Sequence, residues 1–253
     1  MLRLRQICLV ASDLDAIEAD LSAVFGLAVC HRDGGVERFG LHNLLMPVGN
    51  SFLEVVAPFR EDTTAGRFIE RRGGDGGYMV IMQTDDMVAA RERMSALGVR
   101  LVLDGGDGHT DGIQLHPKDV PAAIAELRWN EGGDDPAGPW GPAGPDWLPA
   151  QRTDVIRAMR AAELQTDDPP ALAARWSEVL ARPVEAGPGG APQIALDDAV
   201  IRFVPATDGR AEGLGGLDVE VVDRDRLLAA AEARGCKTSD DLVTVCGVRF
   251  HLV

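Results

Sequence analysis

The sequence has few aromatic residues and few positive charges. Aromatic side chains make up 5% of the 253 residues, with one tyrosine, and 25 Lys and Arg stand against 40 Asp and Glu, for a formal net charge of -15. A strongly acidic chain repels polyanions, which argues against nucleic acid and anionic membranes as partners. The charge therefore predicts solubility.

Long hydrophobic runs and paired cysteine motifs are also missing. No apolar stretch approaches the roughly 18 residues of a membrane span, and the N-terminal residues do not resemble a signal peptide. The four cysteines form no C-x-x-C pair and stand among apolar neighbours, where a thiol behaves as a small hydrophobe: Cys8, Cys30, Cys236 and Cys246. We expect a cytoplasmic protein with free thiols.

One segment is too rich in glycine and proline for a helix or a strand. Residues 131–150 read EGGDDPAGPWGPAGPDWLPA. Trp140 and Trp147 within it predict that this linker packs across a surface, since two exposed indoles would leave much apolar area in water. The linker separates residues 1–130 from residues 151–253, which we expect to form two domains.

The first 130 residues contain a strand, an Asp, an amphipathic helix and a Gly, twice. Asp13 in the first copy corresponds to Asp86 in the second, and the two helices end at Gly26 and Gly98. Each helix is followed by three strand-like runs, at 27–32, 36–48 and 51–58 in the first unit and at 99–104, 112–117 and 123–129 in the second. This order of elements is βαβββ.

The residues beyond the linker repeat the scheme less clearly. A third unit opens with the strand 159–166 and a helix after Asp168, and a fourth opens with the strand 216–222 and a helix after Asp223. The sequence therefore predicts an α+β fold of four βαβββ modules. The glycine-rich stretches, 71–77 and 103–112, lack a phosphate-binding pattern and are expected to be connections.

Several runs in the first half resemble a known superfamily. They are FLEVVAPF at 52–59, MQTDDM at 82–87, ALGVRLVLD at 96–104 and, most specific, LHPKDVPAAIAEL at 115–127. Residues 1–130 resemble the glyoxalase-like proteins of the vicinal oxygen chelate (VOC) superfamily, in particular the methylmalonyl-CoA epimerases; for 151–253 the likeness is architectural. The resemblance implies two glyoxalase-like half-barrel domains, each with a concave face that can carry a divalent metal.

The resemblance also implies where metal ligands would stand. The positions fall on Gln6, Glu54, Met79 and Glu126, with Tyr78 as the one-residue alternative to Met79, and the histidines usual at the first-strand positions are absent. Gln6, Glu54 and Glu126 offer oxygen atoms, which suit Mg²⁺, Mn²⁺ or Ca²⁺ better than Zn²⁺, while Co, Ni and Fe stay open. Met79 and Tyr78 would line the pocket.

A site without metal is the alternative. The two glutamates interrupt apolar strand faces, and a buried carboxylate needs a metal, an ion pair or a proton. Without a metal, we expect Glu54 and Glu126 to be solvated, or paired with Arg67, Arg71 or Arg128.

Two histidines are candidate pocket residues. By the resemblance, His42 lies near the place of the proton-abstracting carboxylate of the epimerases, so His42 and Glu54 are the predicted catalytic residues. A one-residue slip would exchange His42 for Asn43. His116, which precedes Pro117, is expected to orient a turn or to line the pocket mouth.

The second half is predicted to be non-catalytic. His251 falls where Glu126 stands in the second unit, but the matching positions of the third unit are predicted to be Ala161 and Ile201. A single histidine cannot assemble a metal site.

Three functions remain open from the sequence. The first is a metal-assisted isomerase, epimerase or lyase acting on a small carboxylate, thioester or vicinal-oxygen substrate. The second is metal-free binding or sequestration of a small molecule, as in bleomycin-resistance proteins. The third, compatible with either, is assembly: the second half would replace a partner subunit, as a monomeric pseudo-dimer, or the chain would form a homodimer.

Overall fold

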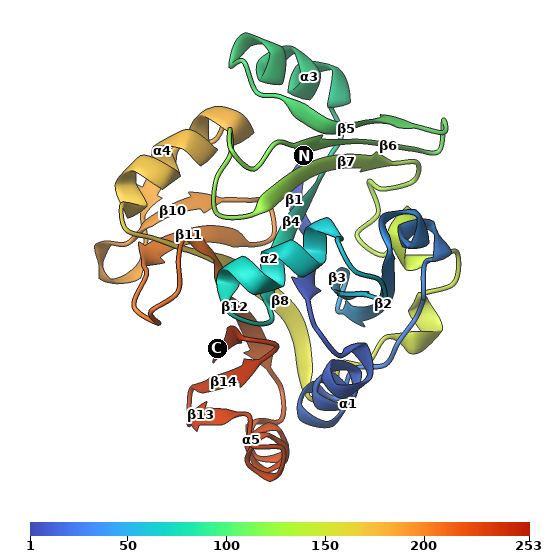
Figure 1. The fold of residues 1–253 in the computed structure, drawn as a ribbon, viewed down its shortest axis with the longest axis vertical. Coiled ribbons are helices and arrows are strands. Elements are labelled where there is room, and N and C mark those ends of the chain that lie inside the picture. The colour runs from blue at the N-terminus through green and yellow to red at the C-terminus, as the bar shows by residue number, and fades with distance from the viewer.

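The computed structural model describes residues 1–253 and contains the four predicted units (Figure 1). The elements of the first half are β1 (Leu2–Val10), α1 (Leu14–Phe25), β2 (Leu41–Val48), β3 (Ser51–Pro58), α2 (Thr64–Arg72), β4 (Gly76–Thr84), α3 (Met87–Ala96), β5 (Leu101–Gly106), β6 (Thr110–Leu115) and β7 (Ile124–Asn130). A 3-10 helix, η1 (Gly34–Phe39), precedes β2.

The linker contains two 3-10 turns, η2 (Gly141–Ala143) and η3 (Leu148–Ala150). The elements after it are β8 (Ile156–Thr166), α4 (Pro169–Leu180), β9 (Val184–Ala186), η4 (Pro188–Gly190), β10 (Pro192–Ala195), β11 (Val200–Pro205), β12 (Gly213–Val221), α5 (Arg224–Ala233), β13 (Lys237–Ser239), β14 (Leu242–Val245) and β15 (Val248–Leu252). The third and fourth units are therefore complete, including the short strands β9 and β13.

Each half builds one mixed sheet. The first sheet has the order β2-β3-β1-β4-β7-β6-β5, and the second has the order β13-β14-β15-β12-β8-β11-β10-β9. In the first, β1 pairs with β4 antiparallel, and these strands pair parallel with β3 and β7, respectively. The second sheet repeats this centre with β15-β12-β8-β11. The prediction of an α+β fold of four βαβββ modules is confirmed.

Aspartate begins the main helix of every unit, as the sequence predicts. Asp13, Asp86, Asp168 and Asp223 each accept a hydrogen bond from the backbone N–H three residues later. This interaction satisfies one of the free N–H groups at a helix start. Gly26 ends α1 in the left-handed region, at φ 69°, where a glycine has no side chain to clash.

Two predictions of elements in the first unit were incomplete. The run 27–32 is not a full strand; it touches the sheet at one isolated bridge, between His31 and Leu45. Residues 36–39 of the predicted run 36–48 belong to the helix η1, because Asp33 caps its first turn. The helix α2 was not predicted at all.

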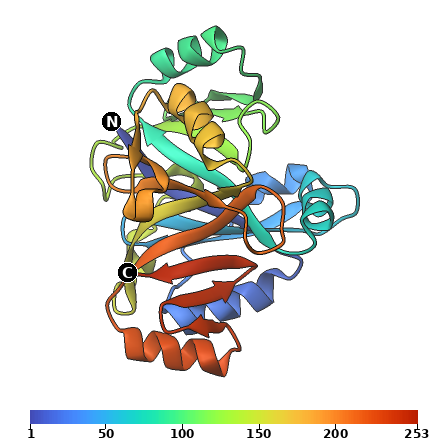
Figure 2. The same cartoon turned by 90° about the vertical axis from the view of Figure 1, so that its left-hand side faces the viewer.

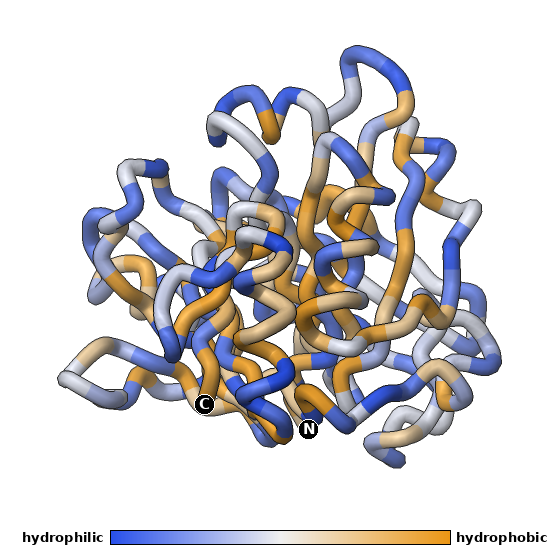
Figure 3. Tube along the Cα trace, turned by 90° about the horizontal axis from the view of Figure 1, so that it is seen from below, coloured by the Kyte–Doolittle hydropathy of each residue, from blue (hydrophilic) through white to orange (hydrophobic).

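The two sheets share one hydrophobic core. Its buried residues come from both halves and include Leu9 and Met82 of the first sheet and Leu164 and Leu217 of the second. Figure 3 shows hydrophobic segments in the interior and hydrophilic ones at the periphery. The helices α1 and α5 lie side by side at one end (Figures 1 and 2). Division into two domains, and a monomeric pseudo-dimer or a homodimer, stay predictions.

The helices of this chain are short. None is both long and apolar enough to cross a membrane.

Candidate functional site

The four predicted metal-ligand positions lie on one face of the first sheet. Cys8 pairs with Glu54 and Met79 on the neighbouring strands, and Ile81 pairs with Gln6 and Glu126. The opposite face packs against α1 and the shared core. The side chains on the first face contact the linker, so we call this the linker face; its apolar members include Cys8, Phe52, Met79, Ile81, Trp140 and Trp147.

The linker closes the centre of this face with Trp140. The indole of Trp140 is fully buried, and its Nε1–H donates to Oε1 of Gln6 at 2.6 Å. Nε2 of Gln6 donates to Oε2 of Glu54 at 2.8 Å, and Nδ2 of Asn43 donates to Oε1 of Glu54 at 2.7 Å. The prediction that the linker packs against a surface is correct, and its indole bonds directly to a predicted metal ligand.

Arg5 fastens the linker to the sheet. Its guanidinium lies 5.2 Å, 5.5 Å and 5.8 Å from the ring centroids of Phe52, Trp140 and Trp147. It also donates to the carbonyl oxygens of Pro136, at 2.7 Å, and Gly138, at 2.9 Å. Burial, followed by the nearby positive charge of Arg3, lowers the pKa of Arg5 to about 10, so the side chain keeps its charge at neutral pH.

Glu126 is held in a separate group of side chains. Its Oε1 accepts from Nε of Arg128 at 2.7 Å, and its Oε2 accepts from Nε2 of Gln114 at 2.9 Å. The carboxylate is almost fully buried and paired, as one of the sequence alternatives proposed. The strands β1 and β4 separate it from Glu54.

The donor atoms do not fit a metal centre. No group of three or more His, Cys, Asp or Glu side chains is arranged to hold a metal ion. The oxygen of Gln6 and both oxygens of Glu54 already accept hydrogen bonds within the protein. A metal that used them would have to displace Trp140 and Asn43, and Met79 offers no ligand to a hard ion.

Glu54 nevertheless has an unusual environment. Burial raises the pKa of its carboxyl group, and hydrogen bonds from Asn43, Cys8 and Gln6 oppose that effect without cancelling it. The pKa of the Cys8 thiol is raised well above its usual range, chiefly by burial and then by the charge of Glu54. The pKa of Glu54 is therefore higher than that of a glutamate in water, and burial is the cause.

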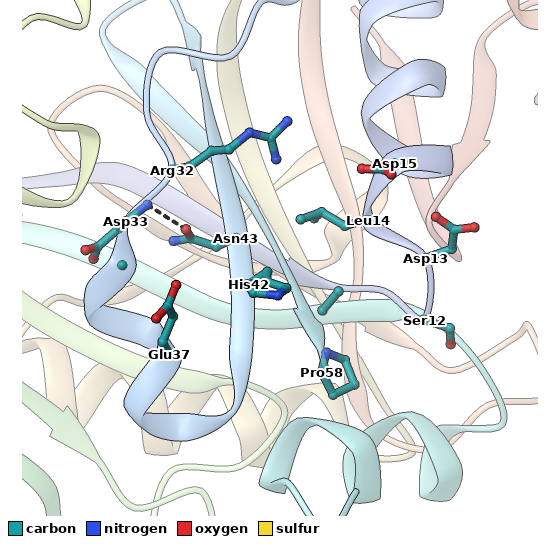
Figure 4. A pocket seen from close by; sticks show the side chains of 12 residues that line it. Ser12, Asp13, Leu14, Asp15, Arg32, Asp33, Glu37, His42, Asn43 and Pro58 are labelled. Atoms are coloured by element: carbon teal, nitrogen blue, oxygen red, sulfur yellow. Dashed lines mark hydrogen bonds between the residues drawn. The ribbon is translucent and has the colours of Figure 1, made fainter. Parts of the chain in front are cut away.

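His42 does not share the linker face. It is exposed, stacks on Phe59 with ring centroids 4.4 Å apart, and pairs with Ala57 across the strands. Figure 4 shows its ring in a separate pocket, while Asn43 turns toward Asp33. His42 and Glu54 therefore lie on opposite faces of the sheet, because alternate residues of β2 face opposite sides, and a catalytic role for either stays a prediction. Asn43 contacts Glu54 instead.

The pocket around His42 is polar. It has a volume of about 590 Å³ and lies between the start of α1, η1 and β2. The carboxylates at its wall are those of Asp13, Asp15, Asp33 and Glu37 (Figure 4). Two of them are used locally, since Asp13 caps α1 and Asp33 caps η1.

His116 organises a turn, which is one of the two roles expected for it. Its Nδ1 accepts from the backbone N–H of Lys118 at 3.1 Å, and its carbonyl oxygen accepts from the N–H groups of Asp119 and Val120. The neighbouring Pro117, and not His116, lines a pocket.

A second, more apolar pocket lies where the two halves meet; we call it the junction pocket. Its volume is about 500 Å³. The residues of the first half that line it are Thr64, Phe68, Arg71, Arg72, Tyr78, Pro117, Ala122, Ala123 and Ile124, and those of the second half are Ala211 and Glu212. Tyr78, predicted as a pocket residue, is therefore in a pocket wall, while Met79 is buried on the linker face.

The second sheet carries a charged network on its corresponding face. Glu163 accepts from Arg202 at 2.8 Å and from Arg249 at 2.9 Å, and Nε2 of His251 lies 3.3 Å from its Oε1. Arg202 also forms an ion pair with Asp218 at 2.7 Å. This network was not predicted.

The sheet registers show which residues correspond between the halves. Glu126 pairs with Ile81 on β4, and His251 pairs with Asp218, the equivalent residue on β12. His251 therefore occupies the position of Glu126, as predicted. The counterpart of Glu54 is Arg202, since Glu163 pairs with Arg202 as Cys8 pairs with Glu54. The prediction of Ile201 at this place was wrong by one residue.

Comparisons with known proteins agree with this fold. Residues 7–180, more than half of the chain, match the family model described as a glyoxalase-like domain. The ethylmalonyl-CoA/methylmalonyl-CoA epimerase of Cereibacter sphaeroides is 25% identical over 130 residues, which cover 50% of this chain and 96% of that protein.

Solved structures are similar in whole or in part. A hypothetical protein from Staphylococcus aureus covers 100% of this chain and 99% of its own, with a TM-score of 0.70 and 11% identity, and shows the fold alone. A variant of Streptomyces coelicolor methylmalonyl-CoA epimerase in complex with 2-nitronate-propionyl-CoA is 26% identical, covers 51% of this chain and 96% of its own, and has a TM-score of 0.45. The family match over residues 7–180 decides the assignment: the chain belongs to the glyoxalase-like domain family of the VOC superfamily.

Proposed function

We propose that this chain binds a small molecule without a metal, in the junction pocket. The observation that carries the proposal is the hydrogen-bonded chain from Trp140 through Gln6 to Glu54. It uses the oxygen atoms that a cation would need and fills the space beside them with an indole. A ligand that bound this face by coordinating a metal would first have to displace the linker.

The junction pocket has the character of a ligand site. Its volume is within the range of about 300 to 1,000 Å³ that is usual for small-molecule pockets. Phe68 and Ile124 give it apolar walls, and Tyr78 and Arg71 supply a few polar groups. Residues of both halves line it, and ligand sites are common at such junctions.

Filling this pocket is expected to abolish binding. A mixture of small carboxylates, amides and aromatic compounds can be screened by ligand-observed NMR against protein treated with EDTA. Ile124→Trp places a larger side chain in the pocket wall and is expected to remove the signals of bound compounds. Val102→Trp, on the exposed face of β5, is the matched control and should retain them.

Two results would contradict this proposal. One is binding that appears only after a divalent metal is added to the wild type. The other is binding that persists unchanged in Ile124→Trp. The thermal unfolding of each variant shows whether a loss of binding reflects a loss of folding.

A metal-independent isomerase or epimerase acting on a small carboxylate or thioester is the second candidate. It is favoured by the protonatable, buried Glu54 together with the 130-residue similarity to an epimerase. In such a reaction the Glu54 carboxylate would take a proton from a carbon next to a carbonyl group and return one to that carbon. The linker would have to move to admit the substrate.

Deuterium exchange tests the second candidate. If Glu54 moves the proton, EDTA-treated protein should catalyse the incorporation of deuterium from D₂O at carbon 2 of methylmalonyl-CoA. Glu54→Gln should lose this exchange, while Glu61→Gln, an exposed glutamate, should keep it. Exchange no faster than in buffer would reject this candidate.

A further inference from the structure

The junction pocket has a positive wall in a strongly acidic protein. Arg71 and Arg72, both from α2, line it together with one carboxylate, that of Glu212. That carboxylate accepts a hydrogen bond from the hydroxyl of Thr166, at 2.6 Å. Two arginines and one carboxylate that is already hydrogen-bonded give the pocket wall a net positive charge. The whole chain has a net charge of -15.

Arg72 shapes the pocket through hydrogen bonds to backbone carbonyl oxygens, and its buried Nε–H has no partner in the protein. The side chain is buried, and its terminal nitrogens donate to the carbonyl oxygens of Ala211, at 3.2 Å, and Leu214, at 3.5 Å. These bonds hold the second half against α2. Arg72 therefore fixes the wall that Ala211 and Glu212 contribute.

Tyr78 and Arg71 also line the pocket with polar groups that form no hydrogen bond within the protein. Tyr78 is only 8% exposed, and its hydroxyl has no hydrogen-bond partner in the protein. Burial raises its pKa to about 12, so the hydroxyl keeps its proton and can donate. Arg71 is exposed at the pocket rim and forms no ion pair. Its charge acts on the Tyr78 hydroxyl, as does that of Arg67.

The wall beside these two groups is apolar. The ring of Phe68 meets the ring of Tyr78 edge to face, with centroids 5.0 Å apart. Ile124 and Ala123 continue the wall along the start of β7. A ligand that satisfies this pocket needs an apolar body and one group that accepts hydrogen bonds from Tyr78 and carries negative charge toward Arg71.

We propose that the junction pocket selects small organic monoanions, with a carboxylate held by Arg71 and Tyr78 and an apolar body against Phe68 and Ile124. This inference rests on the proposed function and adds the chemical class of the ligand. It assigns the selection to two residues that lie outside the closed centre of the linker face.

A matched series of probes tests the selection. Hexanoate, hexanamide and hexylammonium share a chain length and differ in charge, and their dissociation constants can be measured by isothermal titration calorimetry on the full-length protein. We expect hexanoate to bind about tenfold more tightly than hexanamide at low salt, since one charge-assisted contact at a partly exposed site gives an effect of this order. Hexylammonium should bind most weakly.

Variants separate the two residues. Arg71→Ala should remove the preference for hexanoate and leave hexanamide binding nearly unchanged. Tyr78→Phe should weaken both compounds several-fold, because each offers an acceptor to the hydroxyl. Arg67→Ala removes a positive charge from the same helix but not from the pocket wall, so it is the matched control and should reduce the preference much less than Arg71→Ala does.

The outcomes distinguish this inference from the proposed function. Equal binding of hexanoate and hexanamide, both lost in Ile124→Trp, would overturn the anion selection and leave the pocket intact. A preference for hexanoate that survives Arg71→Ala would overturn the role of Arg71. Binding of every probe that persists in Ile124→Trp would overturn both proposals, whereas no binding of any probe would overturn the anion selection alone.

Discussion

Trp140→Ala is expected to lower the free energy of unfolding by about 3 to 5 kcal/mol, the usual cost of truncating a buried tryptophan. The substitution removes a fully buried indole, leaves Oε1 of Gln6 without its donor, and deprives Arg5 of one of its three aromatic neighbours. Chemical denaturation, followed by circular dichroism, measures the change. The denaturant concentration at the midpoint of unfolding should fall in proportion to this loss of stability.

Two matched variants test the cause. Leu148→Ala lies in the same linker, but that side chain is about half exposed, so little change is expected. Trp140→Phe keeps most of the apolar volume and removes the indole N–H, and should cost less than Trp140→Ala. If Trp140→Ala were as stable as Leu148→Ala, Trp140 would not anchor the linker to the first sheet.

Glu163→Gln is expected to have the second large effect. Glu163 forms ion pairs with Arg202 and Arg249, and its side chain is almost completely buried. Removing one member of a buried ion pair costs about 3 to 5 kcal/mol, because the other members keep their desolvation cost. The variant should therefore unfold at a clearly lower denaturant concentration at pH 7.

The same substitution should change the acid dependence of stability. Burial alone would raise the pKa of Glu163, but His251, Arg202 and Arg249 together lower it to about 2. Because the folded value is below the unfolded value, the ionised group stabilises the protein above about pH 4.5. This contribution is lost as the pH falls from there toward 2.

Stability measured between pH 7 and 2 checks this prediction. Wild type should lose stability more steeply with acid than Glu163→Gln. Glu220→Gln, which removes a carboxylate paired with two exposed arginines, is the control and should have a much smaller effect at neutral pH. Parallel acid profiles of wild type and Glu163→Gln would contradict the ionised network.

Local patterns made most of the fold predictable from sequence. An Asp before an apolar stripe depends on neighbouring residues alone and located all four units correctly, and a Gly after the stripe marked the helix end in three of them, while α4 ends at Ala181. The linker was predictable from its composition. Its partner was not, because the contact joins residues far apart in the sequence: Trp140 and Gln6.

The errors at the site come from strands that are apolar on both sides. Leu44, Leu45 and Met46 are consecutive and all buried, so the sequence does not indicate which face of β2 turns toward the linker. The one-residue ambiguity placed His42 where Asn43 lies. The same ambiguity hid Arg202, although charged residues inside two strands of the second sheet were a signal of a buried network.

NMR of the indole N–H groups tests most directly whether Trp140 occupies the place beside Gln6 that a metal would need. The protein has four tryptophans, and Trp140→Phe assigns one resonance. We predict that the Trp140 N–H exchanges slowly with D₂O, as does that of the buried Trp176, which donates to Pro121. We also predict that stoichiometric Mn²⁺ leaves the signal sharp. Rapid exchange, or broadening of this signal by one equivalent of Mn²⁺, would show that Trp140 does not close this face against a metal.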